Sequence, residues 1–384
     1  MKKTLFVLLN FLLCCSVFSE DNNNPIPIPI PAQPATTLPI PPALLVLNAL
    51  FEAIKNENIQ QIQTLVDEGV NVNAKNKDGL TPLVTALEVK NTEIIKILLA
   101  AGANPDITIH NSSWNPLVMA ARDGEIEIVK LFIAAGANIK PESWPGKLAF
   151  NQAMFNGRSE VVKTLLAAGY NVDAKDMNGW TALMEAARHS NAEIVKILIM
   201  AGADVNRSAN GGSIALIQAA LGKKIENVKV LIEAGADVAY KERSGWTVLM
   251  AAAEGGSSEI IEILLAAGAG DVNAIDNNGV SALIRASDKC NAEAVQSLLT
   301  AGANVNAQTI YGRTALTEAV GRDGSIETVN VLIAAGADVN IKNKNNEWPA
   351  LIMATNWGSI EVVKALLAAG AETNVRDNLG NTPL

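Results

Sequence analysis

The sequence predicts an all-α repeat solenoid of about ten helix-turn-helix units joined by β-hairpin-like turns. The first observation is a period of 33 or 34 residues, which ten glycines from Gly69 to Gly370 mark. The second is the similar residue pattern that begins at each of these glycines, as in the GADVN segment at 202–206. The third is an apolar content of 49% with only 4% aromatic residues, which suits thin helices. Units of this size cannot bury their apolar faces alone, so we expect them to stack.

The fifth unit shows how each element is expected to form. Residues 178–179 are Asn-Gly and predict a tight turn, and Thr181 is placed to cap a helix over 182–189. From Asn191 onward, apolar residues at helical spacing, with a Glu/Lys pair on the other side, predict a second helix. Gly202 supplies the left-handed residue that ends it. Each unit is therefore expected to be turn, helix, turn and helix.

Three successive segments resemble the signature segments of ankyrin repeats: DGLTPL at 78–83, EIIKILL at 93–99 and GAN at 102–104. The resemblance covers residues 43–384, and the wording of the units resembles exported, bacterial-type members of that family. It implies a protein-binding role without catalysis. One departure is systematic, because the family's His three residues after the capping Thr is absent, which puts one polar link between repeats in doubt. The residues that stand there instead are mostly apolar: Val84, Val118, Asn151, Met184, Ile217, Met250, Ile284, Thr317 and Ile352.

The units are not all regular. Leu148, Ile214 and Pro349 replace the capping Thr, so units four, six and ten are expected to lose a cap that contributes about 1 kcal/mol each. Unit seven gains Gly270, and unit nine gains a residue near 322–324. We expect hinges at these two irregular units.

The segment before the repeats predicts export. Residues 1–19 hold two lysines, a short apolar stretch and a terminal Ser19, which is typical of a cleaved signal peptide and too short for a comfortable membrane span. Residues 20–42 are Pro-rich and predict a disordered, extended linker before the solenoid at 43–384. We expect a periplasmic, cell-surface or secreted protein. A lipoprotein acylated at Cys15 is the alternative, and it alone would place the protein at a membrane.

Charge and residue inventory exclude several functions. Two of the 30 basic residues lie in the signal, which leaves 28 against 39 acidic residues and a net charge of -11, so nucleic acid is not an expected partner. His110 and His189 have no ligands at metal spacing near them, and no nucleophile or phosphate-loop motif is present. Cys290 is the only cysteine after the signal, so no internal disulfide is possible. We predict a monomeric, non-enzymatic protein without cofactor or metal.

The candidate binding residues follow from the resemblance. In ankyrin repeats the residue before the cap, the turn tips and the ends of the first helices line a concave face that holds partners. Carried over, this places Trp114, Trp180, Trp246 and Trp348 before caps, Trp144 and Tyr311 at turn tips, Trp357 at a helix end, and Arg188 and Arg313 on the same face. Binding is favoured because Trp and Arg are enriched at the energetic centres of interfaces. The alternative is that the indoles only brace neighbouring turns, since thin helices leave no interior room for them.

Charge on this face supports binding. Eight cations face five carboxylates, near +3, and this predicts an acidic or polar protein partner. The alternative function is a passive envelope scaffold or lipid-anchored spacer with no specific partner. The cations are Lys77, Arg122, Lys147, Arg188, Arg243, Lys289, Arg313 and Arg322, and the carboxylates are Asp78, Glu88, Asp123, Glu254 and Asp288.

Overall fold

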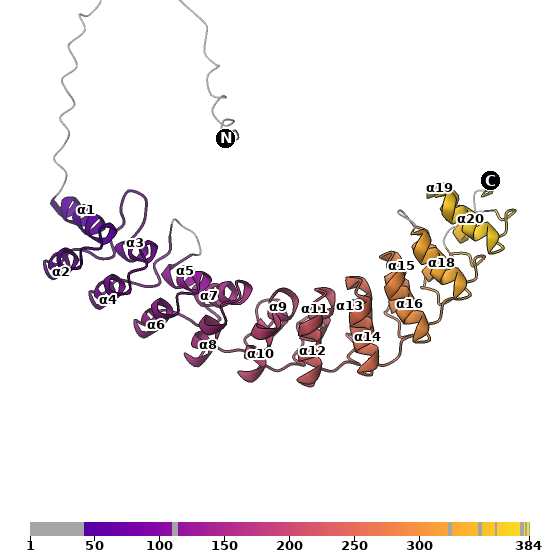
Figure 1. The fold of residues 1–384 in the computed structure, drawn as a ribbon, viewed down its shortest axis with the longest axis horizontal. Coiled ribbons are helices and arrows are strands. Elements are labelled where there is room, and N and C mark those ends of the chain that lie inside the picture. The colour runs from indigo at the N-terminus through magenta and orange to yellow at the C-terminus, as the bar shows by residue number, and fades with distance from the viewer. Residues whose placement is uncertain are drawn as a thin grey trace, which may run out of the picture.

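The computed structural model describes residues 42–109, 114–321, 325–344, 348–357, 359–376, 380 and 382–383. Within these ranges twenty α-helices follow one another, and the only β structure is two isolated bridges in turns. Figure 1 shows a single arc, with the odd-numbered helices along its inner side and the even-numbered helices along its outer side. The predicted all-α solenoid is confirmed. The predicted signal peptide, residues 20–41 of the linker, His110 and Arg322 lie outside the described residues.

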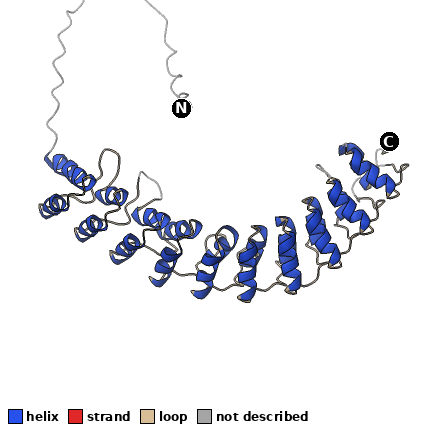
Figure 2. Cartoon of the chain, viewed as in Figure 1, coloured by secondary structure: helices blue, strands red, loops and turns tan. Residues whose placement is uncertain are grey.

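Helices alternate between the two sides of the arc, connected only by turns and loops (Figure 2). None of the described helices combines the length and apolarity that a membrane crossing requires. The inner helices are α1 (Pro42–Lys55), α3 (Pro82–Glu88), α5 (Pro116–Asp123), α7 (Trp144–Phe155), α9 (Ala182–His189), α11 (Ala215–Leu221), α13 (Val248–Gly255), α15 (Ala282–Asp288), α17 (Ala315–Ala319) and α19 (Ala350–Trp357). The outer helices are α2 (Ile59–Asp67), α4 (Thr92–Ala100), α6 (Ile126–Ala134), α8 (Ser159–Ala167), α10 (Ala192–Met200), α12 (Ile225–Glu233), α14 (Ser258–Ala266), α16 (Ala292–Thr300), α18 (Ile326–Ala334) and α20 (Ile360–Ala368).

One apolar core runs the length of the arc between the two rows of helices. It consists mainly of Ala, Leu, Ile and Val, as the composition predicts, and each fully buried Leu or Ile contributes about 1.5–3 kcal/mol. Rings are confined to a few places, such as Phe150, which stacks on Tyr170 with ring centroids 3.9 Å apart. Apolar residues in place of the family's His join this core, as Met184 and Met250 show, both at most 1% exposed.

Helix caps follow the sequence with one correction. Thr181 accepts a hydrogen bond from the backbone N–H of Met184, whereas Ile214 before α11 provides no side-chain cap. Unit four was expected to lose its cap at Leu148, and this is wrong because the cap of α7 lies five residues earlier, at Ser143. Ser143 accepts a hydrogen bond from the backbone N–H of Gly146 at 3.1 Å and caps the helix there. Pro145 fits this early start because its fixed φ suits the first helical turn.

The hairpin-like turns are joined to one another from unit to unit. Within the fifth turn the N–H of Asp176 donates to the carbonyl of Trp180 at 2.9 Å, and Gly179 has the positive φ of +77° that the turn needs. Backbone hydrogen bonds then link neighbouring turn tips along the second half of the arc: Asn210 to Asn178, Asn277 to Ser244, Ile310 to Asn278 and Lys344 to Tyr311, at 2.8–3.0 Å. These backbone bonds join the turns of units five and six, and those of units seven to ten, beside the inner helices.

A second row of hydrogen bonds ties each unit to the next through asparagine. Asn273 donates from Nδ2 to the carbonyl of Gly302 at 3.2 Å and accepts at Oδ1 from the N–H of Asn304 at 2.7 Å. The same pair of bonds recurs at Asn73, Asn206, Asn306 and Asn340, and we call these five residues the asparagine ladder. The ladder supplies polar links between repeats in a chain that lacks the family's His.

The ladder is interrupted where the sequence is irregular. Asp173 keeps only the acceptor half, from the N–H of Asp204 at 3.1 Å, because a carboxylate has no N–H to donate. Lys140 and Ala239 occupy the same position in two other units and cannot form this pair of bonds at all. Beside Ala239 and the extra Gly270 lies a cavity of about 390 Å³. Hinge motion at this irregular unit stays a prediction.

Candidate functional site

The predicted binding residues lie on the turns and inner helices, but their exposure differs. Trp144, Tyr311 and Trp357 are the open ones, with 62%, 51% and 50% of their surface exposed. Trp144 is the first residue of α7 rather than a turn-tip residue, because that helix starts early. The indoles before the caps are only partly exposed, and three of them pack against the core: Trp114, Trp180 and Trp246, with Trp348 partly buried as well.

Two of the partly buried indoles support cations. The guanidinium of Arg122 lies 5.2 Å from the ring centroid of Trp114, and that of Arg285 lies 4.8 Å from the centroid of Trp246. Such contacts are worth about 0.5–1 kcal/mol when exposed and about 2 kcal/mol when desolvated. Since Arg285 belongs to the unit after Trp246, this contact joins two units. The Trp246 indole therefore joins two units, whereas Trp114 contacts an arginine of its own unit, and both indoles remain partly exposed.

Arg188 links units through a short polar chain. Its Nη1 donates to Oε1 of Gln218 at 2.9 Å, and Nε2 of Gln218 donates to Oγ of Ser213 at 2.7 Å. The backbone carbonyl of Arg188 also lies close to Gly222 of the next unit. A Cβ added at Gly222 would be 2.7 Å from that carbonyl oxygen. Arg188 is thus a fixed feature of the inner side.

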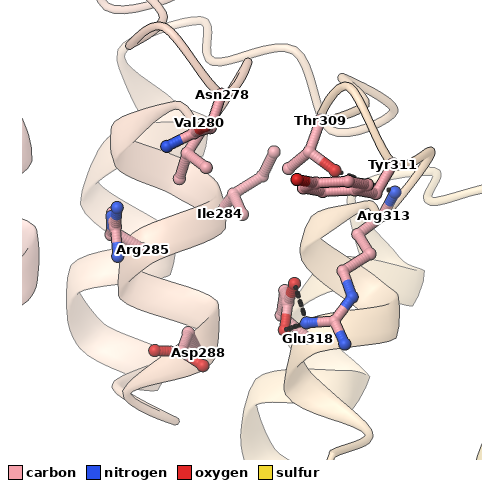
Figure 3. A pocket seen from close by; sticks show the side chains of 9 residues that line it. All are labelled: Asn278, Val280, Ile284, Arg285, Asp288, Thr309, Tyr311, Arg313 and Glu318. Atoms are coloured by element: carbon pink, nitrogen blue, oxygen red, sulfur yellow. Dashed lines mark hydrogen bonds and ion pairs between the residues drawn. The ribbon is translucent and has the colours of Figure 1, made fainter. Parts of the chain in front are cut away.

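Tyr311 and Arg313 come together at one pocket. It has a volume of about 520 Å³ and lies between α15, α17 and the turns that precede them (Figure 3). The close-up shows the Tyr311 ring at one end of the pocket and Asp288 at the other. We call it the Tyr311 pocket, and it is lined by Asn278, Val280, Ile284, Arg285, Asp288, Thr309, Tyr311, Arg313 and Glu318. The other predicted residues do not line it.

Many of the cations that were counted on this face form ion pairs with carboxylates. Arg122 pairs with Asp123 at 2.6 Å, and this hydrogen bond lowers the pKa of the Asp123 carboxyl. Lys289 donates to Glu254 at 2.7 Å, and that bond raises the pKa of the lysine. Lys147–Asp176 and Arg313–Glu318 pair at 3.5 and 3.0 Å. Four of the eight counted cations are therefore already in ion pairs.

Several pocket residues were missed by sequence reasoning. A signal was present, because counting back one period of 33 residues from Tyr311 gives Asn278, and from Glu318 gives Arg285. Equivalent positions in adjacent units lie side by side in a solenoid. Applied to Tyr311 and to Glu318, that rule finds one further pocket residue each.

Other candidate chemistry has little support in the described residues. Among them no group of three or more His, Cys, Asp or Glu side chains could hold a metal ion. His189 is exposed at the end of α9, with its ring edge to face with Phe155 at a centroid distance of 6.0 Å. Cys290 is a free thiol, partly exposed, at a turn residue with φ of +51°.

Comparison with known proteins matches this architecture to one family. The family model described as "Ankyrin repeats (3 copies)" matches residues 50–143, 150–242, 216–309 and 316–384, well over half of the chain. The chain is 42% identical over 59 residues to the human mitochondrial disaggregase, covering 15% of this chain and 8% of that protein. It is 48% identical over 50 residues to a putative ankyrin repeat protein of fowlpox virus (strain NVSL), covering 13% and 36% of the two chains.

A third relative is the human 2-5A-dependent ribonuclease, 34% identical over 65 residues, which are 17% of this chain and 9% of that protein. The chain thus spans less than a tenth of the length of either human protein, and the similarity is confined to segments of 59 and 65 residues. The family match, in contrast, extends along the whole arc of paired helices. The chain belongs to the ankyrin repeat family.

Proposed function

We propose that this chain is a non-enzymatic, exported protein-interaction module that binds a partner protein through the inner, concave side of its arc. Ankyrin repeats are generally protein-interaction modules, and that much follows from the family. The observation that carries the finer proposal is the exposed Tyr311 ring at the wall of a pocket between two stacked units. Aromatic side chains beside such pockets are typical centres of binding energy.

Trp144 and Trp357 extend this surface on the two sides of Tyr311. Trp144 is the first residue of α7, and Trp357 is the last residue of α19. Each leaves at least half of its indole exposed on or beside an inner helix. The partly buried Trp114, Trp180, Trp246 and Trp348 offer only an edge or a face, so we assign them a combined role in bracing and contact. Arg188 and Arg313 complete the proposed site as fixed polar groups.

The partner that we propose is a protein with a polar surface. Counting residues predicted an acidic or polar partner, but ion pairs occupy Arg122, Lys147, Lys289 and Arg313. An ion pair presents little net charge to a partner beyond a few ångströms in salt. We therefore propose a partner with a polar surface, and we do not propose that the concave face generally prefers an acidic partner. We propose that the chain binds as a monomer.

Export and tethering form a separate part of the proposal. It is supported by the signal-like residues 1–19 and the Pro-rich residues 20–42, which would hold the solenoid away from its point of origin. Fractionation of cells expressing the full chain tests it, with recovery in the extracytoplasmic fraction expected. Acylation at Cys15 would show as partitioning into detergent that Cys15→Ser abolishes.

The binding proposal is tested by capture of partners from an extracytoplasmic extract on the immobilised chain. Tyr311→Ala and Trp144→Ala should each reduce capture by about tenfold or more, because exposed aromatics dominate interface energies. Met200→Ala is the matched control, since Met200 is 76% exposed at the end of the outer helix α10. Trp180 and Trp246 are less suitable, because truncating a ring that packs on the core also loosens the fold.

Equal capture by all three variants would refute the concave-face proposal. Failure to capture any stoichiometric partner would favour the passive scaffold instead. Far-ultraviolet circular dichroism of each variant serves as the folding control.

A further inference from the structure

We propose that the Tyr311 pocket receives a basic side chain, arginine or lysine, of the partner protein. The inference rests on the proposed function, because it assigns the chemistry of one subsite on the same face. It is argued from the charges that line the pocket, from the ring at its mouth and from its apolar wall.

The first step is that Arg313 is not available to a ligand anion. Its Nη1 donates to both carboxylate oxygens of Glu318, at 3.0 and 3.1 Å. The Glu318 side chain is only 16% exposed, so this pair is partly shielded from solvent. Together the two groups form a neutral wall of the pocket (Figure 3).

The second step concerns Arg285, whose guanidinium is directed toward the preceding unit. It lies 3.4 Å from Asp276 and 3.7 Å from Glu254, and it stacks on Trp246. All three partners belong to the preceding unit or to the turn before α15. What Arg285 offers the pocket is therefore mainly its aliphatic stem, with its charge already compensated.

The third step leaves one carboxylate without a strong partner. Lys289 donates to Glu254 at 2.7 Å and lies 3.7 Å from Asp288, so its charge is mostly committed to Glu254. The Asp288 side chain lines the pocket and is 47% exposed. Among the described residues around the pocket, three cations (Arg285, Lys289 and Arg313) thus face four carboxylates (Glu254, Asp276, Asp288 and Glu318), and the least compensated carboxylate is that of Asp288.

The position of Asp288 adds to its need for a cation. It is the last residue of α15, where the carbonyl ends of the helix dipole carry partial negative charge. A cation placed beside Asp288 would be attracted by the carboxylate and by the helix end together. An anion would be repelled by both, so an acidic side chain does not fit this subsite.

The remaining walls suit the long stem of a basic side chain. Val280 and Ile284 supply apolar surface against which methylene groups can pack. The exposed ring of Tyr311, at the other end of the pocket from Asp288, offers an apolar face on which the stem can pack, and Thr309 and Asn278 add oxygen atoms that can accept hydrogen bonds. Lysine and arginine are the side chains that combine a stem with a terminal cation.

The test uses the full chain and three blocked tripeptides: acetyl-Gly-Arg-Gly-amide, its citrulline analogue, which is nearly isosteric but uncharged, and acetyl-Gly-Glu-Gly-amide. Dissociation constants are measured by saturation-transfer NMR at low salt. The arginine peptide should bind at least fivefold more tightly than either control peptide. Asp288→Asn and Tyr311→Ala should each weaken it by about fivefold, the effect expected from losing one partly exposed charge pair or the packing of the stem on one ring. Glu193→Gln on the outer helix α10 is the matched control variant, because it removes the same charge elsewhere, and it should leave binding unchanged.

Equal binding of the arginine and citrulline peptides would overturn the inference. So would an Asp288→Asn variant that binds the arginine peptide as tightly as the unchanged chain. Capture of a protein partner that depends on Tyr311 but not on Asp288 would retain the proposed function while removing this assignment. If the chain captures no protein partner but still binds the arginine peptide selectively, the assignment of the pocket would stand and the proposed function would not.

Discussion

Removing one rung of the asparagine ladder should loosen the solenoid locally. Asn273→Ala deletes two hydrogen bonds between units, the 3.2 Å bond to the Gly302 carbonyl and the 2.7 Å bond from the Asn304 N–H. A typical intramolecular hydrogen bond contributes a net 0.5–1.5 kcal/mol, and this side chain is exposed, so the total should be about 1–2 kcal/mol. The hydrogen bond that the backbone N–H of Asn273 donates to Oδ1 of Asp271 does not involve the altered side chain and should persist.

The chain provides its own matched comparison for this effect. At Asp173 the acceptor bond is present but the donor is missing, so Asp173→Asn should add a bond to the Gly202 carbonyl and stabilise by about 0.5–1 kcal/mol. Asn273→Asp should cost a similar amount, because it removes only the donor. The three variants therefore predict an ordered series: Asp173→Asn, unchanged chain, Asn273→Asp, Asn273→Ala.

Native-state hydrogen exchange and urea unfolding measure the series. Exchange at the amide of Asn304 should accelerate about five- to thirtyfold in Asn273→Ala, whereas amides in α1 to α6 should not change, since repeats interact only with their neighbours. The reasoning would be refuted if Asp173→Asn were destabilising, or if Asn273→Ala changed the unfolding free energy by less than about 0.3 kcal/mol.

Three further predictions follow from particular residues. Gly245→Ala should destabilise the chain more than Gly302→Ala in urea unfolding. Both glycines have φ of +85° to +89°, which costs a non-glycine residue about 1–2 kcal/mol, but only at Gly245 would the added Cβ lie 2.7 Å from a neighbouring backbone atom. Equal losses of unfolding free energy would contradict this. Ser143→Ala should cost about 1 kcal/mol and lower the helicity of α7, whereas an unchanged unfolding midpoint would show that this cap is not formed. Burial raises the pKa of the Glu242 carboxyl, so the contribution of this group to stability should fall as pH rises from the usual carboxyl pKa through the folded value. Glu242→Gln should then be more stable than the unchanged chain at pH 7 but not at pH 4. A gain in unfolding free energy that is the same at both pH values would exclude this cause.

The period and the caps made most of the fold predictable. The helix expected at 182–189 is found at Ala182–His189, and the second helix, expected from Asn191 onward, begins at Ala192 with Asn191 as its cap. Each of these features depends on residues that are close in sequence. Local signals of this kind are the ones that a single sequence carries most directly.

The start of α7 was not predictable in the same way. Residues 143–146, Ser-Trp-Pro-Gly, have the composition of a turn, and the five-residue shift from the expected cap at Leu148 hides the helix start. Gly146 explains why the helix can begin there, because a Cβ at this position would collide with the backbone carbonyl of Lys140. That contact exists only in the folded chain.

The candidate site was predictable by position but not by environment. The repeat frame placed Tyr311 and Arg313 next to each other, and the structure brings both into one pocket. It did not show that Trp246 supports Arg285 of the following unit, or that Glu318 occupies Arg313. Side-chain pairing across units depends on rotamers and distances that a residue count does not contain.

Site-specific photo-crosslinking tests the central claim, that the concave side binds a partner protein. A benzophenone amino acid is placed at Tyr311 on the inner side or at Met200 on the outer side, two positions that are both at least half exposed. Irradiation in an extracytoplasmic extract should give a discrete crosslinked protein from position 311 and none from position 200. The same product from both positions, or a product from position 200 alone, would contradict the claim.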